Sequence, residues 1–273
     1  MYFIYKIKIL FLRIFGYEKP LRVAFLKLLS LKFKTFRPHY ETILLESCRE
    51  AKKLGLNEIS ILELGVANGN GIVSLENYKR KIEKFLDIKI TIYGFDNCDG
   101  LPDSDLKEDI KYLWKDGQFK TNKEALEKEI KSKIFYGDIK DTAVNFLRTN
   151  PKNISVIFFD MDYYSSTKKF LDQINSFKNV LLPRVLLYFD DLYFDYNITE
   201  FNGEMLAINE FNVKNKNFKI GSYIDHICDF RFPLAKGLLK TLHNFDHPDY
   251  NKFIADKHSG LGLYDKKIYS DIF

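Results

Sequence analysis

Carboxylates follow five separate apolar runs of this 273-residue sequence. A single acid after an apolar run is often an ordinary helix N-cap, but several caps have no reason to converge in space. Carboxylates that do converge can accept strong hydrogen bonds from hydroxyl groups or ligate a hard cation. The acids concerned are, in chain order, Glu63, Asp96, Asp138, Asp160, Asp162, Asp190 and Asp191.

The last four of these acids form the densest group. If the runs that end at Asp160 and Asp190 are neighbouring strands, their ends lie about 5 Å apart. Carboxylates at that distance cannot all stay ionised unless a cation joins them, and oxygen-only ligands favour a hard divalent ion such as Mg²⁺. Asp160 and Asp162 point the same way if both are extended. Two simpler alternatives stay open: Asp162 caps a helix that begins near Ser165, and Asp190 and Asp191 form a solvated turn.

The hydrophobic pattern predicts the elements that would carry these acids. Residues 39–55 form an amphipathic helix with Gly55 as its stop. Short apolar runs then alternate with helical segments, and the predicted strands are EISILELG, ITIYGFD, KIFYGDI, ISVIFFD and RVLLYFDD. This order predicts an α/β fold with a mostly parallel sheet and helices on both faces. Such sheets bind ligands at the carboxyl ends of their strands, where the acids would then lie.

A loop of small residues, GVANG at 65–69, follows the first predicted strand. Glycine is costly in ordered structure unless the backbone turns sharply or another group approaches closely. The dinucleotide fingerprint G-x-G-x-x-G fails here, because position 67 is Ala and position 70 is Asn. The stretch instead reads Glu63-x-Gly65-x-Ala67-x-Gly69. It resembles the first motif of class I S-adenosylmethionine-dependent methyltransferases, with Ala in place of the middle Gly.

The resemblance implies a Rossmann-like class I methyltransferase sheet with S-adenosylmethionine as cofactor. Asp96 would accept hydrogen bonds from the ribose hydroxyls, which suit an ionised carboxylate, and Asp138 would meet the adenine amino group. Asp96 follows Glu63 by 33 residues (96 − 63), more than the ~20 typical of ribose-binding acids, so an extended helix is expected between them. The cofactor-binding residues implied are Glu63, Gly65, Ala67, Asn68, Gly69, Asp96 and Asp138.

The second half of the sequence carries a narrower resemblance. FFDMDYYSSTKKFLDQI, followed by LLYFDD, is similar to the metal-dependent sugar O-methyltransferases of the macrocin (TylF-like) type, over about residues 58–195. By this resemblance Asp160, Asp190 and Asp191 hold the metal ion, and Asp162 is the general base. The implied activity is methyl transfer to a hydroxyl of a small acceptor, with a sugar or nucleotide-linked sugar expected. The alternative within the fold is a non-catalytic binding module, against which the retained acids argue.

The sequence gives weaker evidence for the residues that recognise the acceptor. The insert at 97–131 is too long to be an idle loop; it is either a lid whose aromatics stack on a sugar or a surface insert anchored by Trp114. His226 is the alternative base, or a partly buried strand histidine. Three tyrosines are expected to line the pocket, and three tail histidines to lie in a solvated loop, because their spacing matches no zinc site. These residues are Tyr163, Tyr164, Tyr193, His243, His247 and His258.

Charge divides the chain at residue 37. Residues 1–37 hold nine Lys or Arg and one acid, a balance of +8, so the remaining 38–273 carry +5 − 8 = −3. An acidic body argues against nucleic-acid binding, and the N/D-P-P-Y motif of amino-group methyltransferases is absent from the sequence. The basic, apolar arm at 1–37 is predicted either to lie on an anionic membrane surface or to pack on the body or on a second subunit of a homo-oligomer. Three cysteines without a CxxC pair indicate a cytoplasmic protein.

Overall fold

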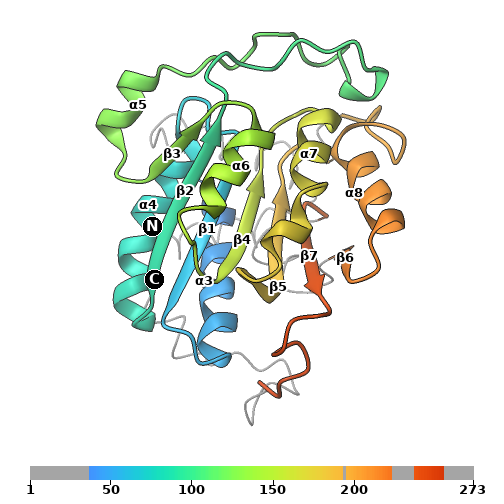
Figure 1. Ribbon diagram of the computed structural model, residues 1–273. Helices are drawn as coiled ribbons and strands as arrows, with labels where there is room; N and C mark the ends of the chain where they lie inside the picture. The colour runs from blue at the N-terminus through green and yellow to red at the C-terminus, as the bar shows by residue number, and fades with distance from the viewer. Residues whose placement is uncertain (1–36, 193–194, 223–236, 255–273) are drawn as a thin grey trace, which may run out of the picture. The chain divides into compact units, whose positions relative to one another are not determined.

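A seven-stranded β-sheet organises the part of the chain that the structure describes (Figure 1). The structure is a computed structural model, and it describes residues 37–192, 195–222 and 237–254. The strand order is β3-β2-β1-β4-β5-β7-β6; β1 to β5 are parallel, and β7 is antiparallel to both of its neighbours. The strands are β1 Glu58–Leu64, β2 Lys89–Asp96, β3 Lys133–Tyr136, β4 Ile154–Phe159, β5 Leu181–Phe189, β6 Phe218–Ser222 and β7 Leu239–Asn244. The predicted α/β class and mostly parallel sheet are confirmed.

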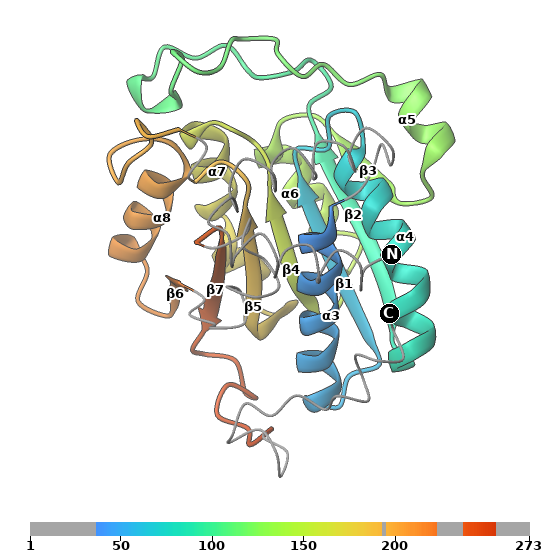
Figure 2. The same ribbon diagram turned by 180° about the vertical axis from the view of Figure 1, so that it is seen from behind.

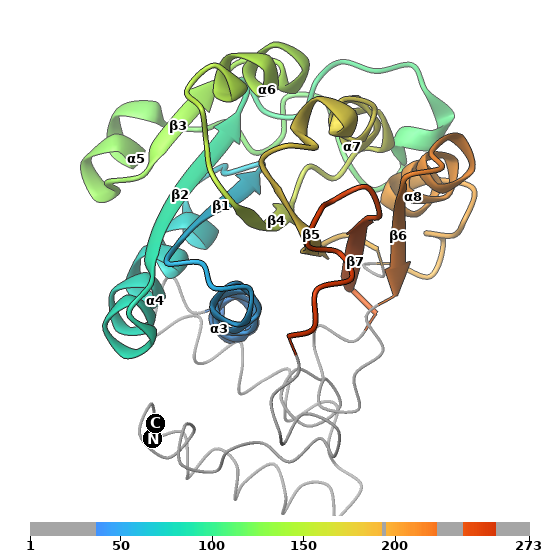
Figure 3. The same ribbon diagram turned by 60° about the horizontal axis from the view of Figure 1, so that its bottom comes forward.

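Helices cover both faces of this sheet (Figures 2 and 3). α3 and α4 lie on one face, and α6, α7 and α8 lie on the other. The helices are α3 Pro38–Lys53, α4 Asn70–Leu86, α5 Lys123–Glu129, α6 Ile139–Leu147, α7 Tyr164–Leu171 and α8 Gly203–Lys214, with 3-10 turns η1 Lys107–Asp109 and η2 Ile174–Phe177. The helix expected to begin near Ser165 is α7, which ends at Leu171 and is followed by η2. The hydrophobic pattern does not predict α8, β6 or β7.

Burial explains why the local sequence forms these elements. Every residue of β4, and every residue of β1 after its first, is buried, as expected for strands covered on both faces. α3 buries Leu44, Cys48 and Ala51 completely, and Gly55, at φ +87°, follows its end in the left-handed conformation that closes helices. α4 is 17 residues long, which confirms the extended helix expected between Glu63 and Asp96.

β1 and β4 lie side by side at the centre of the sheet, although two strands and their helices separate them in the sequence. The chain leaves this point in opposite directions, toward β2 and β3 on one side and β5 on the other. A crevice forms outside the carboxyl ends of strands at such a reversal. The fold therefore predicts the ligand site at the ends of β1, β4 and their immediate neighbours.

Several predictions concern residues outside the described part of the chain. All described residues belong to the unit Arg37–Ile254. Residues 1–36 of the proposed N-terminal arm are not among the described residues, and neither are Tyr193, His226 and His258. Within the described ranges, no helix has both the length and the apolar character needed to cross a bilayer.

Candidate active site

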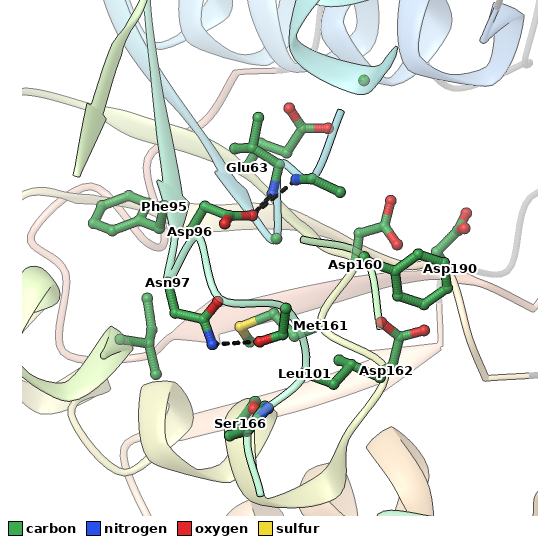
Figure 4. Close-up of a pocket in the computed structure, with 18 of the residues that line it drawn as sticks. Glu63, Phe95, Asp96, Asn97, Leu101, Asp160, Met161, Asp162, Ser166 and Asp190 are labelled. Carbon is green, nitrogen blue, oxygen red and sulfur yellow. Dashed lines mark hydrogen bonds between the residues drawn. The ribbon is translucent and has the colours of Figure 1, made fainter. Parts of the chain in front are cut away.

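A cavity of about 530 Å³ opens at the carboxyl ends of the central strands. Its volume falls in the roughly 300–1,000 Å³ range of small-molecule sites. Figure 4 shows Asp160, Asp162 and Asp190 grouped at one side of it and Asp96 at the other. The acids that line the cavity are all seven that the sequence singles out: Glu63, Asp96, Asp138, Asp160, Asp162, Asp190 and Asp191. The predicted convergence of carboxylates on one rim is confirmed.

The loop after β1 has the backbone that its small residues predict. Gly65, Ala67 and Gly69 all have positive φ, at +86°, +44° and +83°. At Gly65 the reason is close approach as well as conformation, because a Cβ there would lie 1.8 Å from the carbonyl oxygen of Asp160. The loop after β1 thus contacts the backbone of Asp160. Asp160, Asp162, Asp190 and Asp191 together are called the acid cluster below. Gly65, Ala67, Asn68 and the residues that begin α4 line the cavity, whereas Gly69 is not among the lining residues.

Asp96 is held by four hydrogen bonds. Its Oδ2 accepts from the backbone N–H of Val66 at 3.0 Å and of Ala67 at 2.8 Å (Figure 4). Its Oδ1 accepts from the Cys98 N–H at 2.7 Å and from the Thr121 hydroxyl at 2.8 Å. A carboxylate has about four acceptor positions, so in this structure Asp96 joins the loop after β1 to the insert. The ribose role stays a prediction, and it requires a ribose hydroxyl to share or replace one of these donors.

Asp138 is a helix cap, which the sequence left as the simple alternative for any single acid. It precedes α6, and its Oδ1 accepts from the Lys140 N–H at 2.8 Å. Its Oδ2 forms an ion pair with Lys169 at 2.7 Å. Burial raises the pKa of Asp138, but the hydrogen bonds from Lys169 and Lys140 outweigh burial and hold the pKa below its ordinary value. Capping and cavity lining coexist here, and contact with adenine stays a prediction.

The acid cluster is electrostatically crowded. Burial, followed by the charge of Asp190, raises the pKa of Asp160 to about 7. Burial, followed by the charges of Asp160 and Asp190, raises the pKa of Asp162 to about 8. Asp191 is buried, and its pKa is also raised, so the solvated-turn interpretation is wrong for it. Arg37 supplies partial compensation through an ion pair with Asp160 at 3.1 Å.

Asp162 reaches this cluster by a different route from the one predicted. It is not extended: its φ is +60°, a conformation that aspartate tolerates better than most residues. The helix-cap alternative for Asp162 is also wrong, because the N-cap position of α7 is Tyr163. Asp109 of the insert instead accepts from the Ser165 N–H and the Ser165 hydroxyl, both at 2.7 Å. Asp162 is thus spared from capping, and its left-handed backbone turns it toward the cluster.

Asp109 fixes the insert to the rest of the site. It is fully buried, and it accepts hydrogen bonds from Ser165 and from the Ser104 hydroxyl. Trp114 is also buried, in a small apolar cluster with Tyr163, so its predicted anchoring role is confirmed. Trp114 lines the cavity as well, which agrees with the lid interpretation of the same segment.

Two expectations about aromatic and histidine residues are wrong. Tyr163 and Tyr164 are buried but do not line the cavity; the Tyr164 hydroxyl donates to Glu210 at 2.9 Å instead. His243 lies in β7 and not in a solvated loop, with its Nδ1 2.8 Å from the Tyr250 hydroxyl. Long-range contacts therefore determine where these side chains go.

Glu204 is a member of the cluster that the sequence pattern does not reveal. It lies in the first turn of α8 and is 1 % exposed. Its Oε2 accepts from the Asp191 N–H at 3.3 Å. No apolar strand precedes it, which is why the strand-end pattern misses it. Burial, followed by the charge of Asp191, raises the pKa of Glu204 well above its ordinary value.

The oxygen atoms of the cluster are ligands of the kind that a hard cation prefers. All of them belong to carboxylates, and Asp191 Oδ2 and Glu204 Oε1 are buried without a hydrogen-bond partner among the described residues. Such oxygens are unfavourable unless something neutralises them. Across the described ranges, however, no three His, Cys, Asp or Glu side chains are arranged to hold an ion. The cluster therefore has suitable ligands that are not gathered around one point.

Comparison with known proteins places the fold. No family model and no curated protein matches the sequence. Among solved structures, CalS11, a calicheamicin methyltransferase, is 20 % identical with a TM-score of 0.52, over 79 % of this chain and 83 % of that one. An apo structure of CalS11, described as a TDP-rhamnose 3′-O-methyltransferase, is 18 % identical with a TM-score of 0.45, over 79 % of this chain and 84 % of that one. A putative class I S-adenosylmethionine-dependent methyltransferase from Listeria monocytogenes is 16 % identical with a TM-score of 0.38, over 84 % of this chain and 67 % of that one.

The first of these likenesses, together with the sheet order and the site at its centre, defines the class of the fold. The chain has the Rossmann-like fold of class I S-adenosylmethionine-dependent methyltransferases. This confirms the fold that the motif around Gly65 implies. The cavity, in turn, occupies the region where open α/β sheets bind their ligands.

Proposed function

We propose that this protein is an S-adenosylmethionine-dependent O-methyltransferase that acts on a hydroxyl of a small acceptor with the help of a hard divalent cation. One observation carries the proposal: acids from five strand ends line a single cavity in a class I methyltransferase fold. The acids at the β2 and β3 ends serve the cofactor, and those at the β4 and β5 ends serve the acceptor and the cation.

The cofactor half of the cavity consists of the loop at 65–69, Asp96 and Asp138. S-adenosylmethionine, when bound, supplies an electrophilic methyl group. The positive φ values of the loop and its lack of large side chains allow a ligand to lie against the backbone. Asp96 keeps the loop in this shape through the Val66 and Ala67 N–H groups.

The acceptor half consists of the acid cluster. Asp160, Asp190 and Asp191 would hold the cation, with Mg²⁺ as first choice because every donor is an oxygen. A cation bound to these carboxylates would lower the pKa of an acceptor hydroxyl. It would also oppose the carboxylate charges that, after burial, raise the pKa of Asp162 to about 8.

Asp162 is the proposed general base. At neutral pH a carboxyl with a pKa of about 8 is mostly protonated and cannot accept a proton. Neutralising Asp160 and Asp190 removes part of that shift, so the cation and the base depend on each other. A well-placed base contributes roughly 10²–10⁴-fold in rate.

The acceptor is proposed to be a sugar or a nucleotide-linked sugar. The cavity is lined on the insert side by Leu101, Pro102, Trp114 and Phe119. Aromatic and apolar walls with a few convergent polar groups are typical of small-molecule sites. The description of CalS11 as a TDP-rhamnose 3′-O-methyltransferase agrees with this acceptor class, as does the resemblance of the FFDMDYYSST stretch.

Location and partners are part of the proposal. The cysteine pattern favours the cytoplasm. The arm at 1–37 is proposed to contact an anionic membrane surface or a second subunit, and no nucleic acid is expected as substrate. A nucleic-acid methyltransferase is the competing activity, and binding that weakens steeply with salt would support it.

Calorimetric titration tests the proposal most directly. Full-length protein is titrated with S-adenosylhomocysteine in Mg²⁺ and again after treatment with a chelator, and methyl transfer to a panel of nucleotide sugars is measured in parallel. Binding of S-adenosylhomocysteine and transfer abolished by the chelator are expected. Asp160→Ala and Asp190→Ala should both lose transfer, and Asp190→Ala should keep cofactor binding. Full transfer in the chelator, or in both variants, would eliminate the cation from the mechanism.

A further inference from the structure

The cofactor class proposed above carries an α-carboxylate, which must find a cation in an acidic cavity. Among the described residues that line the cavity, the cationic side chains are Arg37 and Lys169. Lys169 is committed to Asp138, at 2.7 Å, on the side proposed for adenine. Arg37 contacts Asp160 instead, at 3.1 Å, and the loop after β1 lies against the backbone of Asp160.

Backbone groups of the loop are poorly placed to bind the carboxylate themselves. The Gly65 N–H donates to Phe95 O at 2.9 Å, and the Gly69 N–H donates to Val66 O at 2.8 Å. The Val66 and Ala67 N–H groups both donate to Asp96. Four of the five backbone N–H groups at 65–69 are thus already paired, which favours a side chain as the main partner of the carboxylate.

Arg37 is held in a fixed position beside the start of α4. Its Nη1 donates to the Tyr40 hydroxyl at 2.7 Å and to Asp160 Oδ2 at 3.1 Å. A Cβ added at Gly71 would lie 1.7 Å from Glu63 Oε1 and 3.0 Å from the Tyr40 ring, so both side chains adjoin the start of α4. Gly71 belongs to the first turn of α4 and lines the cavity, and a helix N-terminus favours negative charge. Arg37 and the α4 N-terminus therefore face the same part of the cavity, and Glu63 offsets part of their positive potential there.

We propose that Arg37 binds the α-carboxylate of the methionine part of S-adenosylmethionine. A guanidinium has five N–H donors in a planar fork that matches a carboxylate, and both hydrogen bonds described above use Nη1. Asp160 and Tyr40 thus orient the fork, and Arg37 links the cofactor to the acid cluster. This inference rests on the proposed function, because it assumes that the ligand is S-adenosylmethionine.

A thermodynamic cycle tests the assignment. Full-length wild-type protein and Arg37→Met are each titrated with S-adenosylhomocysteine and with its decarboxylated analogue, which keeps the amine. Loss of a charge-assisted pair is expected to weaken S-adenosylhomocysteine binding on the order of 10- to 100-fold in the variant. The decarboxylated analogue should bind both proteins within about twofold of each other, since it has no group for Arg37 to bind.

Controls separate this role from a structural one. Arg37→Lys keeps the charge but loses the fork, and an intermediate loss is expected. Lys169→Met removes the other cation of the cavity and should change the affinities of both ligands by the same factor, because Lys169 lies at Asp138. If Arg37→Met does not fold, the comparison of the two ligands in Arg37→Lys carries the test.

The outcomes distinguish the two levels of the argument. Wild-type protein that binds neither ligand refutes the proposed function itself. Wild-type protein that binds S-adenosylhomocysteine, combined with Arg37 variants that weaken both ligands equally or not at all, refutes only the role of Arg37. A loss confined to the carboxylate-bearing ligand establishes it.

Discussion

Replacement of Gly65 by alanine tests the contact that joins the two halves of the site. Gly65 has φ +86°, and a Cβ there would lie 1.8 Å from Asp160 O and 2.7 Å from Asp160 C. These are backbone atoms, so no side-chain rotation relieves the clash. The loop after β1 and the segment after β4 must separate, although the Asp160 N–H donates to Leu64 O at 2.9 Å.

Gly55 provides a matched control for the magnitude. Its φ is +87°, but nothing lies within 4 Å of an added Cβ. Gly55→Ala therefore incurs only the left-handed penalty, about 1–2 kcal/mol. Gly65→Ala incurs the same penalty and, in addition, the roughly 1–3 kcal/mol typical of overpacking. Gly65→Ala is thus expected to lower the free energy of unfolding by about 2–5 kcal/mol.

Urea unfolding followed by circular dichroism measures both variants. A native-state titration with S-adenosylhomocysteine then asks whether the surviving fold still binds. Gly65→Ala should lose affinity because the loop moves away from Asp160, whereas Gly55→Ala, at the far end of β1, should bind like the wild type. Equal destabilisation by the two substitutions, with normal binding in both, would show that the contact between the loop and Asp160 does not shape the site.

Three further predictions concern the acids. In the absence of divalent cations, the free energy of unfolding should fall as pH rises from about 4 to 8. The folded-state pKa of Asp160 is raised to about 7 and that of Asp162 to about 8, so the folded protein binds more protons than the unfolded chain across this window. Urea unfolding at pH 5 and 8 checks the sign, and a stability that rises with pH would contradict it. Asp162→Asn should reduce kcat by roughly 10²–10⁴-fold with S-adenosylhomocysteine affinity unchanged, and an unchanged kcat would reassign the base. Asp109→Ala should lower the free energy of unfolding by about 1–3 kcal/mol and shift the fluorescence emission of Trp114, the only tryptophan. Asp103→Ala, at a side chain that is 93 % exposed, should change neither quantity. Equal effects of the two substitutions would show that Asp109 does not anchor the insert.

The approach of remote segments explains why the site tolerates so many acids. Arg37, before α3, neutralises part of the charge on Asp160, and Tyr188 donates to Asp190 at 2.6 Å. Glu204, from α8, adds a further buried carboxyl beside Asp191. A cluster of this kind is destabilising by itself, so its presence is better explained by function than by stability.

The local sequence was enough to predict the sheet and the place of the acids on it. Apolar runs of five to nine residues, each followed by a polar residue and a helical segment, are sufficient to specify parallel strands buried on both faces. Parallel strands bring their carboxyl ends to one edge, so Glu63, Asp96, Asp160 and Asp190 had to meet. The small residues at 65–69 likewise indicated a backbone with positive φ, because side-chain size and left-handed conformation are linked locally.

The role open to each acid depends on contacts that form in the folded chain. Asp96 is occupied by four donors, Asp138 caps α6, and Asp109, from a distant insert, caps α7 in place of Asp162. Glu204 and Arg37 join the cluster from elements that carry no strand-end pattern. Hydrogen-bond partners and pKa shifts depend on which groups approach through space, and residues 56 positions apart, such as Asp109 and Ser165, have no local pattern that connects them.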